Sequence, residues 1–190
     1  MINLTNSPGK FTTALSYQLN LLALLAISGS LIAAFYYQIA FNELPCPLCQ
    51  LQRVALTLVG IGMMLNIRFG ASNVHYAMIL ASAIVGAATS MRQILLHIAP
   101  GDQGYGSALF GVHFYTWSFI SFVVTMVFCA VMLCIDRQPD KQLNRGAVGV
   151  VATAVIVLFF ALAAANTVSS VMVCQFGPCP DDPTQYLWKF

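Results

Sequence analysis

The stretch YQLNLLALLAISGSLIAAFYYQIAF, residues 17–41, decides the fold class of this chain. It lies within an interval without charged residues that extends from Lys10 to Glu43. Similar intervals extend from Arg68 to Arg92, from Asp102 to Asp136 and from Arg145 to Asp181. Each interval can hold the roughly 20 apolar residues that a membrane-spanning helix needs. The sequence therefore predicts an all-α integral membrane protein.

The composition points to the same class of protein. Of the 190 residues, 59% are hydrophobic and 7% are charged, and the mean hydropathy is +0.80. A soluble domain has about 25% charged residues, so this chain lacks the polar surface of a soluble protein. We expect one membrane domain with a short outer tail, residues 173–190. Its five spans are expected at residues 17–41, 51–67, 74–98, 113–135 and 147–172, and the first is too long for a signal-peptide core.

Lysine and arginine residues predict the orientation of the chain in the membrane. If the chain crosses five times, one side holds Lys10, Arg68, Arg137, Lys141 and Arg145. Short cytoplasmic loops are enriched in these residue types, so we expect a cytoplasmic N-terminus and an outer C-terminus. The net charge of +2 gives no indication of a nucleic-acid partner, and membrane lipid is the expected surrounding.

Two close cysteine pairs, Cys46 with Cys49 and Cys174 with Cys179, then fall on the outer side. Disulfides persist outside the cytosol, so this placement predicts thiol–disulfide chemistry. Pro47 favours a helix start, where the helix dipole stabilises a thiolate in a C-x-x-C pair. A structural disulfide or half of a metal site is the alternative for this pair, and a simple staple is the alternative for Cys174 and Cys179.

Other polar and sulfur-containing residues lie within or beside the expected spans. Arg53 follows Cys49 by four residues, on the same helical face, and could donate hydrogen bonds to a membrane-borne electron acceptor or reach lipid phosphate. Arg92 and His97, near the outer end of the third span, are further candidates for a pocket. Cys129 and Cys134 point about 140° apart on one helix and are expected to be inert thiols.

The run Pro45-Cys46-Pro47-Leu48-Cys49-Gln50-Leu51-Gln52-Arg53 resembles the signature of the disulfide bond formation protein B (DsbB) family. The resemblance extends over the first four spans and implies a four-helix bundle of the bacterial inner membrane, here with a fifth helix added. It implies that the protein binds a quinone (ubiquinone or menaquinone) and reoxidises a periplasmic thioredoxin-like oxidase, DsbA. By the same resemblance, Cys46 and Cys49 pass electrons to the quinone beside Arg53, with Arg92 or His97 near other quinone contacts.

The chain departs from this family in its second cysteine pair. The family has that pair in the outer loop between spans three and four, where this chain has no cysteine. Here a fifth span is followed by Cys174 and Cys179, which lie on the correct side to substitute. We therefore expect a relay in which the partner's dithiol reduces Cys174–Cys179, which then exchanges with Cys46–Cys49.

Three other readings of the sequence stay open at this stage. A vitamin K epoxide reductase-like quinone reductase uses similar parts, although its C-x-x-C lies near a late helix rather than at the start of the second. Four outer cysteines could instead hold a metal ion such as zinc. A purely structural membrane protein is the third alternative.

Overall fold

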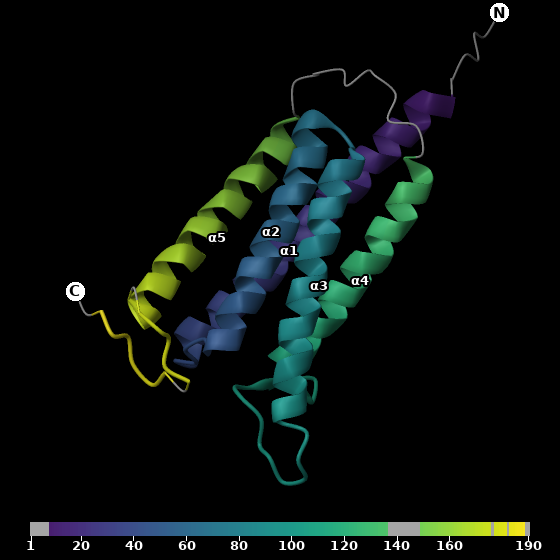
Figure 1. The fold of residues 1–190 in the computed structure, drawn as a ribbon. Coiled ribbons are helices and arrows are strands. Elements are labelled where there is room, and N and C mark those ends of the chain that lie inside the picture. The colour runs from purple at the N-terminus through teal and green to yellow at the C-terminus, as the bar shows by residue number, and fades with distance from the viewer. Residues whose placement is uncertain (1–7, 137–148, 176, 182, 189–190) are drawn as a thin grey trace, which may run out of the picture.

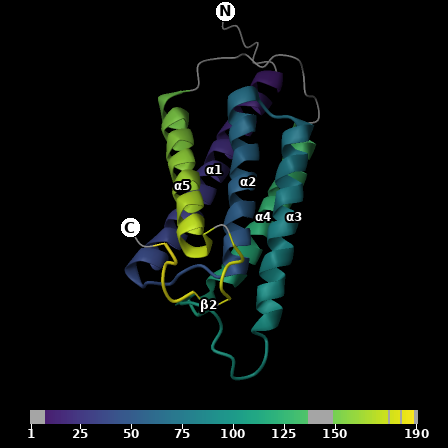
Figure 2. The same ribbon diagram turned by 60° about the vertical axis from the view of Figure 1, so that its left-hand side comes forward.

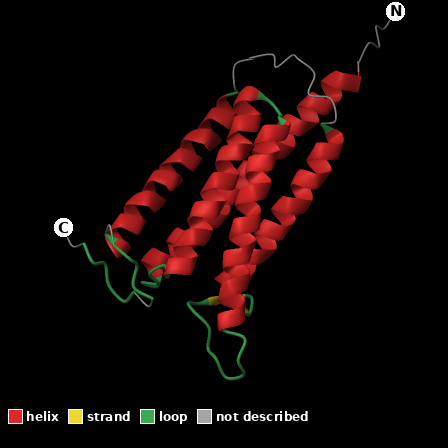
Figure 3. Ribbon diagram, viewed as in Figure 1, coloured by secondary structure: helices red, strands yellow, loops and turns green. Residues whose placement is uncertain are grey.

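Five long helices make up most of the computed structural model, which describes residues 8–136, 149–175, 177–181 and 183–188. They are α1 (Pro8–Ala40), α2 (Pro47–Phe69), α3 (Asn73–Leu96), α4 (Phe114–Ile135) and α5 (Val150–Cys174) (Figures 1 and 3). Two short strands, β1 (Ala108–Leu109) and β2 (Val112–His113), pair antiparallel between α3 and α4. Within the described ranges, all five helices are long and apolar enough to cross a membrane. The prediction of an all-α integral membrane protein is therefore confirmed.

Each expected span overlaps one of these helices; α1 begins nine residues before the expected span, and the other ends differ by at most four residues. Helix α2 begins at Pro47, four residues before the expected span, because Cys46 caps it and Pro47 occupies its first turn. Helix α3 begins after Ser72, whose side chain accepts a hydrogen bond from the amide of Val74 at 3.3 Å. Between these helices the chain turns at Gly70, where φ is 90°.

Small residues allow the helices to pack closely. A β-carbon at Gly60 would overlap the ring of Phe159, so α5 lies directly against α2 at this point. Gly86 likewise makes room on α3 for the ring of Phe122 from α4. Glycine at helix contacts is typical of membrane proteins, where close van der Waals packing drives association. The glycines therefore fix how near α5 and α4 come to the centre of the bundle.

The start of α2 and the end of α5 lie at the same end of the bundle (Figures 1 and 2). Both cysteine pairs occur at these two points of the chain, so the bundle brings them to one end. Which side of the membrane this end faces is still a prediction. It depends in part on Arg137, Lys141 and Arg145, which lie outside the described residues.

Polar side chains also gather at the opposite end of the bundle. We call this group the distal network; its members are Ser16, Asn20, Asn66, Tyr76 and Asp136. The carboxylate of Asp136 accepts hydrogen bonds of 2.8 Å from both Ser16 and Tyr76. Asn20 donates to the Tyr76 hydroxyl at 3.0 Å and accepts from Asn66 at 3.0 Å. The distal network thus ties α1, α2 and α3 to the end of α4.

Candidate redox site

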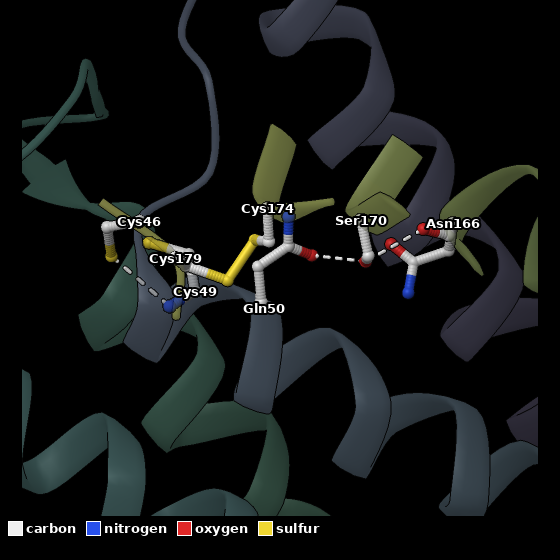
Figure 4. The surroundings of a disulfide bond; sticks show 7 residues. All are labelled: Cys46, Cys49, Gln50, Asn166, Ser170, Cys174 and Cys179. Carbon is white, nitrogen blue, oxygen red and sulfur yellow. Dashed lines mark hydrogen bonds between the residues drawn. A yellow bond between two sulfur atoms is a disulfide. The ribbon is translucent and has the colours of Figure 1, made fainter. Parts of the chain in front are cut away.

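Cys46 and Cys49 lie at the first turn of α2, and both are free thiols. The backbone amide of Cys49 donates to the sulfur of Cys46 at 3.2 Å, so the cysteine side chain serves as the helix cap (Figure 4). Cys46 is buried, and Cys49 is half-buried. The hydrogen bond between the two side chains raises the pKa of the Cys46 thiol above its ordinary range, and burial raises it further.

Gln93 of α3 contacts both sulfurs, and the sequence analysis did not single it out. Its Nε2 lies 3.4 Å from the sulfur of Cys46 and 3.5 Å from that of Cys49. Gln52 fixes this amide by donating to Gln93 Oε1 at 2.8 Å. Gln93 is 2% exposed. The signal in the sequence that could have identified it is a polar amide within an apolar span.

Arg53 lies one turn beyond Cys49 and is buried, with 8% of its surface exposed. Its Nη1 donates to Gln38 Oε1 at 2.6 Å, and its Nη2 donates to the carbonyl of Ala34 at 3.2 Å. The guanidinium also lies 5.4 Å from the ring centroid of Phe35, within cation–π range. Helix α1 therefore holds the arginine inside the bundle, rather than leaving it to reach lipid phosphate.

A cavity of about 250 Å³ opens beside these residues, and both Cys49 and Arg53 line it. The shared helical face that the four-residue spacing predicts is thereby confirmed. The remaining lining is largely aromatic or small, including Ala33, Ala34, Tyr37, Phe114, Tyr115 and Trp117. Such a lining suits a flat, mostly apolar molecule, with the arginine as a polar contact.

The loop between α3 and α4 covers one side of the cavity. Ser107 donates to the Glu43 carboxylate through both its amide, at 3.1 Å, and its hydroxyl. The Tyr105 hydroxyl donates to the carbonyl of Leu44 at 2.6 Å. Gly106, with φ of 70°, brings the loop backbone close to Glu43. These contacts join the loop to the segment immediately before Cys46.

The structure does not bring Arg92 and His97 to the cavity. Arg92 is exposed on α3, and neither residue belongs to the described lining of the cavity. His97 stacks on Tyr115, a lining residue, with ring centroids 5.7 Å apart. Its Nδ1 also lies 3.2 Å from Asp102, whose pKa is lowered by the amide of Gly104 and by His97. The inward-facing residue of this part of α3 is Gln93 instead.

Cys174 and Cys179 form a disulfide with a Cα–Cα distance of 4.4 Å. The pair packs with Leu44, two residues before Cys46, and with Tyr186 of the tail. One turn earlier on α5, the hydroxyl of Ser170 donates to Gln50 Oε1 at 2.7 Å, next to Cys49 in the chain (Figure 4). The two cysteine pairs are therefore attached to one packed region.

The other two cysteines, Cys129 and Cys134, lie on α4, away from the two pairs. Cys129 is buried in the bundle and Cys134 is exposed, on different sides of α4. Across the described ranges, no cluster of three or more His, Cys, Asp or Glu residues could hold a metal ion. The bonded Cys174 and Cys179 also have no thiolate to offer a metal.

The fold and the site together define an all-α integral membrane protein with a C-x-x-C pair beside a mostly apolar cavity. The family model described as Disulfide bond formation protein DsbB matches residues 16–105. Proteins named Disulfide bond formation protein B are similar, with 35% identity over 86 residues in Hahella chejuensis and 39% over 89 residues in Pseudomonas syringae pv. tomato. These matches support membership of this chain in the DsbB family.

The matches cover less than half of the chain. The aligned part is 43% of the chain for the Hahella protein and 45% for the Pseudomonas protein, and 52% and 50% of those relatives. The chain thus spans about half the length of the curated relatives it matches. The family match ends at residue 105, before α4 and α5, and so is shorter than the four spans that the sequence resemblance implied. No solved structure matches the chain.

Proposed function

We propose that this protein is a quinone-dependent thiol oxidase of the bacterial inner membrane, which reoxidises a DsbA-like dithiol oxidase in the periplasm. The observation that carries the proposal is that Cys49 and the buried Arg53 line one cavity at the start of α2. Similarity to proteins named Disulfide bond formation protein B supports it. All five helices would act as one membrane domain, with the N-terminus cytoplasmic and the C-terminus periplasmic.

The terminal pair is the proposed entry point for electrons. One thiolate of the partner attacks the Cys174–Cys179 disulfide, giving a mixed disulfide and releasing one cysteine as a thiolate. The partner's second thiol then resolves the mixed disulfide, so the partner leaves oxidised and the terminal pair becomes a dithiol. This dithiol exchanges in the same way with a Cys46–Cys49 disulfide, and the terminal pair returns to its bonded form.

Cys46 and Cys49 are the proposed exit point. When both are thiols, a bound quinone supplies the oxidant, since it accepts their two electrons and two protons as they form a disulfide. Gln93 donates hydrogen bonds to both sulfurs and would stabilise negative charge that develops on Cys49. Cys49 is the cysteine that lines the cavity, so it is the sulfur proposed to face the oxidant.

The residues of the cavity fit a quinone. Its rings of Tyr37, Phe114 and Trp117 suit a flat aromatic head group. The Arg53 guanidinium carries five N–H donors, more than its two acceptors on α1 use, so it can also donate to a carbonyl. Arg53 would therefore orient the head group and stabilise negative charge on its oxygen.

The test is anaerobic mixing of the purified full chain with a short-chain quinone and a reduced DsbA-like oxidase. Wild type should reduce the quinone and oxidise the partner in equal amounts. Cys46→Ser should abolish quinone reduction from any thiol donor, whereas Cys174→Ser should abolish it only with the protein partner. Cys134→Ser, which changes an exposed thiol on α4, is the matched control and should behave as wild type. Quinone reduction by Cys46→Ser would contradict the proposal.

A further inference from the structure

A chain of hydrogen bonds connects the C-terminal tail to the arginine of the cavity. Gln38 of α1 is the central group, and it is buried. Its Oε1 accepts from Arg53 at 2.6 Å. Its Nε2 donates to the Tyr186 hydroxyl at 2.9 Å and to the Ser169 hydroxyl at 2.7 Å. One amide therefore links the tail and α5 to the guanidinium.

Tyr186 is held in place by its attachment to the end of α5. It packs with Cys174, Cys179 and Leu44 in one small apolar cluster. Directly after it in the chain, Gln175 Nε2 donates to the carbonyl of Leu187 at 3.4 Å, and the amide of Trp188 donates to the carbonyl of Met172 at 3.2 Å. The disulfide fixes the start of the segment that carries this tyrosine, because Cys179 precedes it by seven residues.

We propose that Gln38 and Tyr186 are positioning residues for Arg53, and that through them the cavity responds to the state of the Cys174–Cys179 disulfide. This inference rests on the proposed function. Tyr186 orients the Gln38 amide, which presents its oxygen to Arg53 and so holds the guanidinium toward the cavity. With the disulfide closed, this chain is intact.

Reduction of the disulfide by a dithiol breaks the S–S bond, transfers two electrons and two protons to Cys174 and Cys179, and leaves the dithiol as a disulfide. The tail then loses its covalent anchor near Tyr186, and Gln38 loses an acceptor. Quinone affinity falls while the terminal pair is reduced. Quinone affinity is restored when Cys174 and Cys179 form their disulfide again and Cys46 and Cys49 are the reduced pair. The quinone therefore binds tightly only after the electrons have reached Cys46 and Cys49.

The first test measures equilibrium binding of a short-chain ubiquinone to the purified full chain. Tyr186→Phe keeps the ring and removes the acceptor for Gln38, so the Kd should rise by about three- to tenfold, the effect of one lost hydrogen bond. In an Arg53→Lys background the same change should have little further effect, because Tyr186 acts through Arg53. Tyr36→Phe, at a 59% exposed position of α1, is the control and should bind as wild type. An unchanged Kd for Tyr186→Phe, or full additivity with Arg53→Lys, would overturn the inference.

The second test opens the disulfide without a reductant, using the double variant Cys174→Ser/Cys179→Ser. In a Trp117→Phe background, Trp188 of the tail is the one remaining tryptophan and reports tail docking by its fluorescence. Opening the ring should change this emission, because Trp188 leaves its contact with Met172. The Kd is measured in the chain that keeps Trp117, where opening the ring should raise it to the level of Tyr186→Phe. Unchanged emission and unchanged Kd would both count against the coupling.

The two proposals fail in different ways. If wild type neither binds nor reduces the quinone, the proposed function is wrong and the inference falls with it. If wild type reduces the quinone through Cys46 while Tyr186→Phe and the open-ring variant bind it as wild type does, only the inference is wrong.

Discussion

Polar side chains are buried at both ends of the bundle, and the two groups differ in what they contact. In the distal network, Asn20, Tyr76 and Asp136 hydrogen-bond to one another and to neighbouring helices. At the cysteine end, Arg53 and Gln93 contact thiols or line a cavity instead. Buried polar groups that satisfy one another hold helices together, whereas groups directed at a cavity or a sulfur are available for chemistry.

The two ends of the bundle also differ in how many of their buried polar atoms have a hydrogen-bond partner. At the cysteine end, Gln50 Nε2 and Asn166 Oδ1 are buried without a partner among the residues that the structure describes. They lie on α2 and α5, near the Ser170 hydroxyl that joins these helices (Figure 4). The cysteine end is thus less completely satisfied than the distal network. We expect substitutions at the distal end to change stability, and those at the cysteine end to change activity.

The largest effect is expected from Arg53→Met. A hydrogen bond to a charged donor contributes about 1.5–3 kcal/mol, so quinone binding should weaken by roughly 10- to 100-fold. The measurement is kcat/KM for a short-chain quinone with dithiothreitol as the electron donor. Arg92→Met removes a similar charge from an exposed position on α3 and should leave kcat/KM unchanged. Equal losses in the two variants would show that Arg92 also contacts the quinone, as the sequence alone predicts.

Tyr76→Phe should have the next largest effect, on stability rather than activity. It removes the hydroxyl that joins Asn20 to Asp136, and the two hydrogen bonds lost with it together contribute about 1–3 kcal/mol. The free energy of unfolding in mixed micelles should fall by that amount, while turnover per folded molecule stays at the wild-type value. A loss of turnover without a loss of stability would contradict the assignment of a purely structural role to the distal network.

Gln93→Leu should reduce the reactivity of the cysteine pair by about three- to tenfold, the effect of one hydrogen bond. The amide donates a hydrogen bond to the Cys49 sulfur, and such a donor stabilises the thiolate that attacks iodoacetamide, so its loss should slow alkylation of Cys49. The rate is measured by mass spectrometry. The alkylation rate of exposed Cys134 in the same sample provides the internal reference. An alkylation rate of Cys49 equal to that of wild type would show that Gln93 does not affect the reactivity of the cysteine pair.

The smallest effect concerns Asp102 in the loop over the cavity. Its pKa lies below the usual range because the amide of Gly104 and the side chain of His97 favour the carboxylate. A depressed pKa in the folded state stabilises the loop at neutral pH, and this contribution is lost as the pH falls through that value. Carboxyl-detected NMR titration should give a pKa for Asp102 below that of an aspartate in a short peptide. Asp102→Asn should leave quinone turnover at neutral pH unchanged.

Local signals in the sequence predicted the start of the site correctly. Pro47 and the adjacent cysteine predicted a helix start, and the four-residue spacing predicted that Cys49 and Arg53 share a face. The sequence did not indicate which residue of α3 faces the cysteines, since Arg92 stands out by its charge while Gln93 is the buried neighbour. This helix is apolar around most of its circumference, so sequence periodicity could not indicate which face packs against α2.

The contacts of the tail could not be predicted at all. Gln38 and Tyr186 are 148 residues apart, and no local pattern links them. Their contact depends on how closely α5 approaches α1 and α2, which is fixed by packing such as that of Phe159 over Gly60. The sequence predicted that the tail lies at the same end as Cys46. The contact of the tail with Gln38, and through it with Arg53, depends on the assembled bundle.

The position of Tyr186 after all five helices has a consequence for biosynthesis. The segment from α1 to α2 leaves the ribosome first and already contains Cys46, Cys49 and Arg53, but Tyr186, the tail partner of Gln38, is translated after α5. A nascent chain that has inserted only its early helices therefore carries reactive thiols beside an incomplete cavity. Maturation of the cysteine end has to wait until α5 is inserted and the tail packs against it.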